Sequence, residues 1–291
     1  MIIQRIFQGP GNQMFQYAFG YTCARKNYAE LKLDLNWYKY YSHHRSYILD
    51  TFNVETMQAT EDEIISVKKC LDSRILSTYA KKTSNFFVPY YKKSIVKEDT
   101  SKFDHNLLSI KDNTYIDGYF TSEAFFKNYE DQIRRIFTFK NKPDGMNEKL
   151  LHQIIGQNSV ALSIRRGDFV GNPLHDVCSA EYFYEAIAYL SERVEGLHFY
   201  IFSDNIDWVH KNMNFTGNYR LMDFNHPNYM EDFRLMTYCK YHIIPNSTFS
   251  WWAAWLSSRP GKIVMAPERW LNGKEIEYRH VVPKQWIKIK N

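Results

Sequence analysis

The chain has 291 residues, of which 44% are hydrophobic and 17% aromatic, so it can build a large core in one or two domains. Its net charge of +5 is mild and its lysines are dispersed, which argues against a nucleic-acid binder and leaves room for phosphate-bearing substrates. No apolar run approaches the ~18 residues that cross a bilayer, and the scattered cysteines Cys23, Cys70, Cys178 and Cys239 are expected to be reduced thiols of a cytoplasmic protein.

The N-terminal half begins with an apolar segment, residues 2–7, that is too short for a signal peptide and is expected to be a strand. A glycine turn at 9–13 then leads into a helix expected over 13–27. Further on, Thr60 and Glu63 have the spacing of a capping box that opens a helix. The remaining expected elements are a strand over 31–35, a strand over 114–120 and a helix over 122–136, whereas residues 72–113 give the weakest pattern.

The C-terminal half alternates short apolar runs with helical patterns, which is typical of a doubly wound α/β domain with a parallel sheet. In chain order we expect strand 160–165, helix 179–194, strand 197–202, a short helix after 204, strand 219–222, helix 229–239, strand 241–244, helix 248–257 and strand 262–265. The segment 140–145, Lys-Asn-Lys-Pro-Asp-Gly, has the composition of a linker. We therefore place a domain boundary there and expect domains over 1–141 and 142–291.

Arg165 and Arg166 stand at the carboxyl end of the strand expected over 160–165. Ligands of open α/β sheets bind beyond the carboxyl ends of the strands, and the guanidinium fork binds phosphate oxygens bidentately. A glycine and a carboxylate, Gly167 and Asp168, come next. The segment predicts an anion clamp at a nucleotide site. By itself it also leaves open a surface arginine pair that is bridged to nearby carboxylates.

A second segment of this kind, residues 243–252, ends a buried strand and opens a helix with Asn246, Ser247 and Thr248. These residue types cap helices, and free backbone N–H groups with hydroxyls at a helix start bind anions. Ordinary capping is the alternative. We favour an anion-binding role for these residues and Ser250, because the arginine pair lies in the same predicted domain, and we expect the tryptophans that follow to be core.

Ser203 and Asp204 follow the strand expected over 197–202, again at a carboxyl edge. A carboxylate there can accept hydrogen bonds from a guanine base or from a ribose hydroxyl. An equally weighted alternative is that Asp204 caps the short helix that contains Asp207 and Trp208. We retain both interpretations of Asp204, ligand binding and helix capping.

The glycine turn between the first strand and the first helix contains Gly9, Gly11, Asn12 and Gln13. It is neither a G-x-G-x-x-G fingerprint nor a P-loop. Glycines with two amides suit close backbone approach to a polar ligand, and a tight turn with a helix cap is the competing interpretation. The chain has no HExxH motif, no clustered Cys and His and no Asp-x-Asp after a strand, so no metal site is predicted.

Together these segments resemble the α-1,2-fucosyltransferases of glycosyltransferase family 11. The family carries a Gly-x-Gly-Asn-Gln-Met-Phe-Gln-Tyr-Ala opening, matched by residues 9–18, and a His-x-Arg-Arg-Gly-Asp-Tyr motif, similar to residues 163–169. Ser163 and Phe169 depart from that motif, since the family usually has His and Tyr there. In related fucosyltransferases that His helps to hold the nucleotide, so the resemblance leaves open how this chain replaces that contact. The other similar segments are 117–123, 175–179, 202–208, 231–255 and 266–270.

The resemblance implies a GT-B-like α/β fold, with two Rossmann-like domains whose parallel sheets face an interdomain cleft. It implies an N-terminal domain on the acceptor side and a C-terminal domain that binds GDP-fucose. The implied reaction moves L-fucose with inversion to the 2-hydroxyl of a galactose-containing glycan, without a metal or another cofactor. A non-catalytic sugar-binding protein and a nucleic-acid-binding protein are the competing classes. We expect a cytoplasmic enzyme, with peripheral association at the inner membrane face left open.

This reaction sets two catalytic tasks. The leaving diphosphate must be stabilised as charge develops, which the two arginines and the helix start near 247–250 can do in place of a metal. The acceptor hydroxyl must lose a proton to a base. Asp168, His175 and Asp176 lie on the loop that leaves the arginine strand and are the candidates, although a structural ion pair with an arginine is the favoured role of Asp168.

Overall fold

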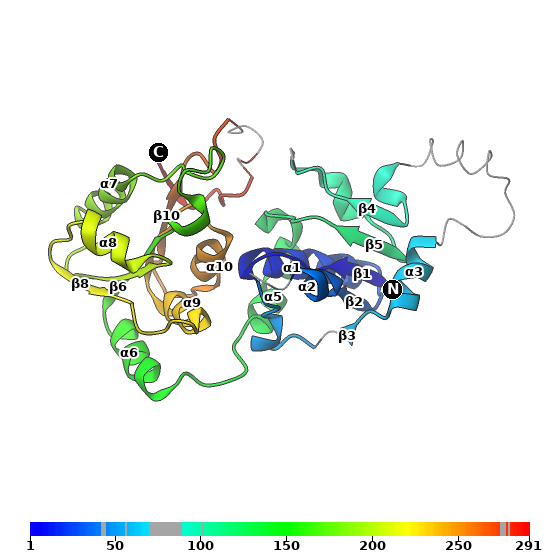
Figure 1. Ribbon diagram of the computed structural model, residues 1–291, viewed down its shortest axis with the longest axis horizontal. Coiled ribbons are helices and arrows are strands. Elements are labelled where there is room, and N and C mark those ends of the chain that lie inside the picture. Colours follow the sequence, from blue (N-terminus) through cyan, green and yellow to red (C-terminus); the bar gives the residue numbers. More distant parts are fainter. Residues whose placement is uncertain (42–44, 56, 70–88, 101, 274–277, 279) are drawn as a thin grey trace, which may run out of the picture. The chain divides into compact units, whose positions relative to one another are not determined.

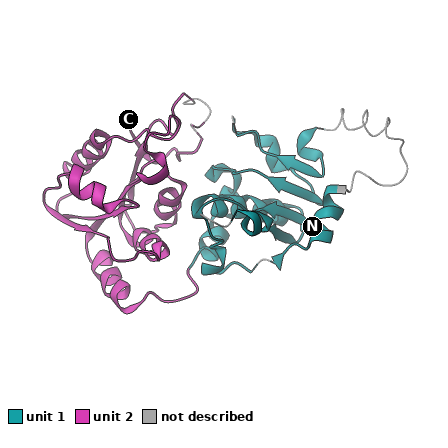
Figure 2. Ribbon diagram, viewed as in Figure 1, with its two compact units in different colours: residues 1–138 teal, residues 139–291 magenta. Residues whose placement is uncertain are grey.

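The structure is a computed structural model that describes residues 1–41, 45–55, 57–69, 89–100, 102–273, 278 and 280–291. The chain folds into two compact units, residues 1–138 and 139–291 (Figure 2). The boundary between the units falls at 138/139, whereas the linker composition predicts it at 141/142. Cys23, Cys178 and Cys239 are free and buried, and Cys70 lies outside the described residues.

Unit 1 is built on a five-stranded sheet in the order β3-β2-β1-β5-β4, and all of its pairings are parallel (Figure 1). Its strands are β1 (Ile2–Arg5), β2 (Leu31–Asp34), β3 (Met57–Gln58), β4 (Ile95–Lys97) and β5 (Thr114–Asp117). Its α-helices are α1 (Pro10–Lys26), α2 (Asn36–Tyr40), α3 (Glu61–Lys69) and α5 (Glu130–Ile136), and its 3-10 helices are η1 (Leu49–Thr51), η2 (Tyr90–Lys92), η3 (His105–Ser109), η4 (Glu123–Phe125) and η5 (Lys127–Tyr129).

Helix α1 begins at Pro10, where a missing N–H costs nothing because the first turn has no partner for it. It is buried on nearly all sides, and Phe19 stacks on Phe120 with ring centroids 3.9 Å apart. The capping box predicted for α3 is confirmed. Glu63 Oε2 accepts from Thr60 N at 2.8 Å, and Thr60 Oγ1 accepts from Glu63 N at 3.2 Å.

Unit 2 is built on a six-stranded sheet in the order β11-β10-β9-β6-β7-β8, and its pairings are also all parallel. Its strands are β6 (Asn158–Ile164), β7 (Leu197–Ser203), β8 (Asn218–Leu221), β9 (Tyr241–Ile243), β10 (Ile263–Pro267) and β11 (Ile287–Ile289). Its helices are α6 (Gly145–Ile155), η6 (Gly167–Phe169), α7 (Ala180–Ser191), α8 (Ile206–Asn212), α9 (Tyr229–Tyr238) and α10 (Thr248–Leu256). The strand–helix alternation predicted for this half is confirmed.

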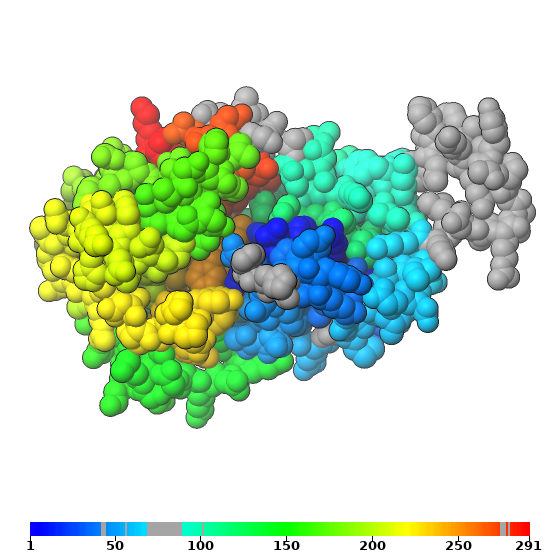
Figure 3. All heavy atoms as spheres, in the orientation of Figure 1, coloured from blue at the N-terminus to red at the C-terminus, as the bar shows by residue number. Residues whose placement is uncertain are grey.

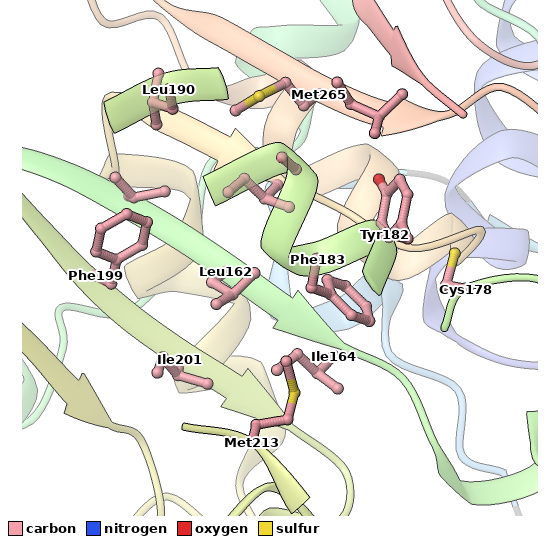
Figure 4. Packing of buried hydrophobic residues seen from close by; sticks show 14 of the residues in the cluster. Leu162, Ile164, Cys178, Tyr182, Phe183, Leu190, Phe199, Ile201, Met213 and Met265 are labelled. Carbon is pink, nitrogen blue, oxygen red and sulfur yellow. The ribbon is translucent and has the colours of Figure 1, made fainter. Parts of the chain in front are cut away.

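The core of unit 2 forms where α7 packs on the sheet (Figure 4). Leu162 and Ile164 of β6 contribute buried side chains, as do Ile201 of β7 and Phe183 of α7. β6 lies in the middle of the sheet and is buried along six of its seven residues. By contrast β8 is an edge strand with three exposed residues, and its segment lies on the surface in Figure 3. The end of β6 is therefore a rigid point from which a site can be built.

The helix predicted over 122–136 is wrong in its first half, where the structure has η4 and η5 and only then α5. Ser122 accepts from Ala124 N and starts η4, and Phe126 has φ −132°, which no α-helix accommodates. Both Phe125 and Phe126 are buried, so packing of these rings overrides the local helical pattern. The predicted strand 114–120 also ends early, at Asp117, and Phe120 adopts a positive φ of 54°, which is outside the range of a strand.

Several elements of the structure are not among those predicted from the sequence, including α2, β11 and α6. Helix α6 begins within the predicted linker, since Asp144 Oδ1 accepts from Met146 N at 3.2 Å and Asn147 N at 2.9 Å. Among the helices of the described ranges, none has the length and apolar character to span a bilayer.

Candidate functional site

The arginine pair lies where the sequence predicts it, directly after β6. Arg165 makes two ion pairs: Nη1 lies 2.9 Å from Asp204 Oδ2, and Nη2 lies 2.5 Å from Asp168 Oδ1. The favoured structural role of Asp168, an ion pair with an arginine, is thus present. The guanidinium carbon of Arg165 also lies 5.3 Å from the centre of the Phe169 ring. Arg165 is therefore held on two sides by carboxylates and is covered in part by an aromatic ring.

Asp204 reaches Arg165 because β6 and β7 are adjacent parallel strands that end together, with Ile164 opposite Ser203. Its Oδ1 accepts from the backbone N–H of Arg166 at 2.8 Å. The alternative that Asp204 caps the short helix is wrong, since the N-cap of α8 is Asn205, whose Oδ1 accepts from Trp208 N at 3.0 Å. Ser203 Oγ accepts from Asn205 N at 3.1 Å, which ties its hydroxyl to the same turn.

Arg166 points to a different neighbour. Its guanidinium carbon lies 3.8 Å from the centre of the Trp208 ring, a close cation–π contact. Its Nε is buried and has no hydrogen-bond partner in the described part of the chain. Trp208 was missed as a site residue. Its position in the first turn of the helix after β7, at the same sheet edge as the arginines, is the signal that could have indicated it.

The start of α10 lies beside this arginine loop, because β9 pairs in parallel with β6 and both strands end at the same edge. Ser247 is the N-cap and makes no side-chain capping bond, and Thr248 is the first helical residue. Ser250 is buried, and its Oγ lies 2.7 Å from Ser163 Oγ. Ser163, which stands where the family usually has His, thus binds the α10 turn directly, and the Ser250 hydroxyl is already paired.

Asn246 has a structural role at this edge of the sheet. It is buried, and its Nδ2 donates to His175 O at 3.0 Å and to Trp270 O at 3.0 Å. Both amide hydrogens are therefore used to join the loop after β6 to the loop after β10. The donor contact predicted for Asn246 is not tested by these bonds and stays a prediction.

Of the base candidates, Asp168 lies in η6, and His175 and Asp176 lie on the loop between η6 and α7. The His175 ring stacks on Phe169 with centroids 4.8 Å apart, and its Nδ1 is buried with no partner among the residues described. Burial lowers the pKa of His175, and the charge of Asp168 opposes that shift. Asp176 Oδ2 accepts from Gly171 N at 3.0 Å and closes the loop. The geometry brings Asp168 and His175 together and gives Asp176 a bond within the loop.

In unit 1 the glycine turn forms the start of α1. Gly9 is the N-cap, and its carbonyl accepts from Asn12 N and Gln13 N, both at 3.1 Å. Gln13 is buried, with Nε2 donating to Gln8 O and Ser46 O and Oε1 accepting from Ile48 N. The Gln13 amide therefore ties the loop near 46–48 to the turn, and its predicted ligand contact stays a prediction. Gly11 is buried and Asn12 is half-buried.

Glu98 is a further residue of unit 1 that the sequence pattern did not indicate. Its Oε2 accepts from Tyr119 N at 2.6 Å and from Phe120 N at 2.9 Å, so it supports the turn after β5. Burial raises the pKa of Glu98. Across the described ranges of both units, no group of three or more His, Cys, Asp or Glu side chains is arranged to hold a metal ion.

The chain belongs to glycosyl transferase family 11, since the model of that family matches residues 1–290. Alpha-1,2-colitosyltransferase of Escherichia coli is 32% identical over 297 residues, covering 100% of this chain and 99% of that protein. Galactoside 2-alpha-L-fucosyltransferase of Caenorhabditis elegans is 28% identical over 171 residues, covering 51% of this chain and 44% of that protein. The predicted family is confirmed.

The fold class is GT-B-like, as predicted. NodZ alpha-1,6-fucosyltransferase, a structure co-crystallized with GDP, aligns with a TM-score of 0.54 and covers 91% of this chain and 94% of that chain. Its sequence identity is 13%, so the likeness concerns the fold. Both proteins are α/β, and here each unit is built on a parallel sheet.

Proposed function

We propose that this glycosyltransferase moves L-fucose from GDP-fucose to the 2-hydroxyl of a galactose-containing glycan, with inversion and without a metal. The observation that carries the proposal is the grouping of cationic side chains and a helix start at the carboxyl edge of the unit 2 sheet. There Arg165 and Arg166 follow β6, and the N-terminus of α10, capped by Ser247, follows the adjacent β9. Two guanidiniums and a helix start are the groups that stabilise a leaving diphosphate.

In this proposal unit 2 binds the donor and unit 1 binds the acceptor. Arg165 and Arg166 contact the diphosphate, and Ser247 and Thr248 add hydrogen-bond donors from the helix start. His175 is the favoured base, because partial burial lowers the pKa of its ring and leaves it neutral and able to accept a proton at neutral pH. The cytoplasmic location and the peripheral membrane association stay predictions from the sequence.

The activity is tested by incubating the protein with GDP-fucose and a panel of galactosides and determining the linkage of the product by NMR. An α-1,2-linked fucoside is expected. Saturable GDP binding by calorimetry, with weaker binding of UDP, separates the enzyme from a lectin or a nucleic-acid binder. Equal affinity for GDP and UDP would refute guanine recognition.

A direct test of the clamp is Arg165→Lys. The lysine keeps the charge but loses the planar fork, so turnover should fall by orders of magnitude, because a lost transition-state donor costs about 3–4 kcal/mol. Near-normal turnover in this variant would remove Arg165 from the assigned role.

A second donor is favoured by the full-length match to alpha-1,2-colitosyltransferase. Colitose is L-fucose without its 3-hydroxyl, so both sugars present the same leaving group and the same anomeric carbon. A site that hydrogen-bonds the 3-hydroxyl rejects the deoxy sugar strongly, whereas an apolar pocket does not. Comparison of kcat/KM for the two GDP-sugars with one acceptor decides between them.

A further inference from the structure

Arg165 forms ion pairs with two carboxylates, Asp204 and Asp168, which differ in their exposure to solvent. Asp204 belongs to the sheet edge: besides its ion pair with Arg165, it accepts from the backbone N–H of Arg166. Gly167 packs directly on it, since a Cβ at Gly167 would lie 2.4 Å from Asp204 Oδ2. The Asp204 side chain is 25% exposed. This carboxylate is built into the arginine loop.

Asp168 is the more exposed of the two carboxylates. Its side chain is 54% exposed and lies three residues after Arg165, on the single turn η6, which has no buried residue. Such exposed ion pairs contribute little, because water and salt screen them. Its carboxylate nevertheless occupies Arg165 Nη2, one end of the fork that a phosphate group uses for bidentate binding.

We propose that Asp204 is the positioning residue that fixes Arg165 and that Asp168 is a counter-ion which the donor diphosphate displaces from Nη2. The inference rests on the proposed function, which supplies the diphosphate. Displacement is favourable because a diphosphate brings more charge and more acceptor oxygens than one exposed carboxylate. Arg165 then keeps one carboxylate for orientation and turns the other side of its fork to the ligand.

The two roles predict opposite effects of the same chemical change. Asp168→Asn and Asp204→Asn each remove one negative charge, so general electrostatics alone would tighten anion binding in both. Under the proposal Asp168→Asn binds GDP about two- to fivefold more tightly, the range given by the strength of an exposed ion pair. Asp204→Asn binds GDP at least about tenfold more weakly, because Arg165 loses its orientation.

The experiment is calorimetric titration of the wild type and both variants with GDP and, separately, with inorganic pyrophosphate. Asp207→Asn is the matched control: it removes the same charge from an exposed residue of α8 and should change neither affinity. If Asp204→Asn does not fold, as judged by its thermal transition, Asp204→Glu replaces it and should also bind more weakly, because its carboxylate is moved by one methylene group.

Shifts in the same direction for Asp168→Asn and the Asp204 variant, or weaker binding by Asp168→Asn, would overturn the inference. Failure of the proposed function can be distinguished from failure of this inference. A protein that binds pyrophosphate with the expected opposite shifts but has no saturable GDP site supports the counter-ion exchange and refutes the nucleotide donor. A wild type that binds neither probe refutes both.

Discussion

Ser163 Oγ and Ser250 Oγ lie 2.7 Å apart and are buried, so a single hydroxyl pair joins the end of β6 to the first turn of α10. The arginines follow β6 directly, and the helix start is the other half of the proposed diphosphate site. The hydroxyl pair thus fixes the distance between the two parts of that site.

Replacing either hydroxyl tests this connection. Ser163→Ala should lower the free energy of unfolding by about 1–2 kcal/mol, because it leaves the buried Ser250 hydroxyl without this partner. Ser250→Ala should have a similar effect, and the double variant should cost less than the sum. Urea denaturation of the four proteins measures the coupling. Strict additivity of the two single variants would show that the hydroxyls do not stabilise each other.

Gly167→Ala should weaken GDP binding by about tenfold, because its Cβ would meet Asp204 Oδ2 at 2.4 Å and push that carboxylate away from the arginines. Gly145→Ala is the control. A Cβ there meets nothing within 4 Å at the start of α6, so this variant should bind GDP normally and be no less stable. Unchanged GDP affinity in Gly167→Ala would mean that the close packing of Gly167 on Asp204 is not needed.

His242 predicts how stability depends on pH. Burial, with the positive charge of Lys262, lowers the pKa of His242 to about 3. In the unfolded chain a histidine titrates near ~6.5, so the unfolded state binds the proton first as the pH falls. The contribution to stability is present above about pH 6.5 and is lost below it, by up to about 1.4 kcal/mol per pH unit until the folded state titrates.

Chemical denaturation from about pH 7 to about pH 5 measures this slope. His242→Gln removes the titrating group, so its free energy of unfolding should fall less steeply over the same range. His175 and His198 also have lowered pKa values and contribute slopes of the same sign in the variant, whereas Asp232, whose pKa burial raises to about 6, contributes a slope of the opposite sign in both proteins. Parallel curves for wild type and variant would contradict the assignment to His242.

The base is tested by the pH dependence of kcat/KM. If His175 accepts the proton, activity rises with pH through the pKa of its ring, and burial places this acidic limb below the ordinary ~6.5. Asp168→Asn removes the charge that opposes the shift, so the limb should move to still lower pH. His175→Ala should lose turnover and keep GDP-fucose affinity. Substantial turnover in the Ala variants of His175, Asp168 and Asp176 would place the base elsewhere.

Transfer should continue after EDTA treatment. Arg165 and Arg166 bring fixed positive charge to the proposed diphosphate site, and such charge replaces the role of a metal in stabilising a leaving group. The assay compares initial rates before and after chelation and dialysis. Loss of activity that Mg²⁺ or Mn²⁺ restores would show that the arginines are not sufficient.

The sequence by itself determined the features that depend on neighbours a few residues apart. The apolar runs of β6, β7 and β9 indicate buried strands, and the spacing of Thr60 and Glu63 indicates the cap of α3. The Asp168–Arg165 ion pair is also a local feature, since Asp168 is only three positions after Arg165 in the chain. These contacts are set by the local path of the backbone, which the order of residues largely fixes.

Only the tertiary structure decided what joins distant segments. Asp204 meets the arginine loop because β7 lies beside β6, and Ser250 meets Ser163 because β9 lies on the other side of β6. Buried rings such as Phe125 and Phe126 broke a helix that the local pattern favours. Strand order and register are set by the summed burial and hydrogen bonding of the whole sheet, and no short stretch of sequence contains that sum.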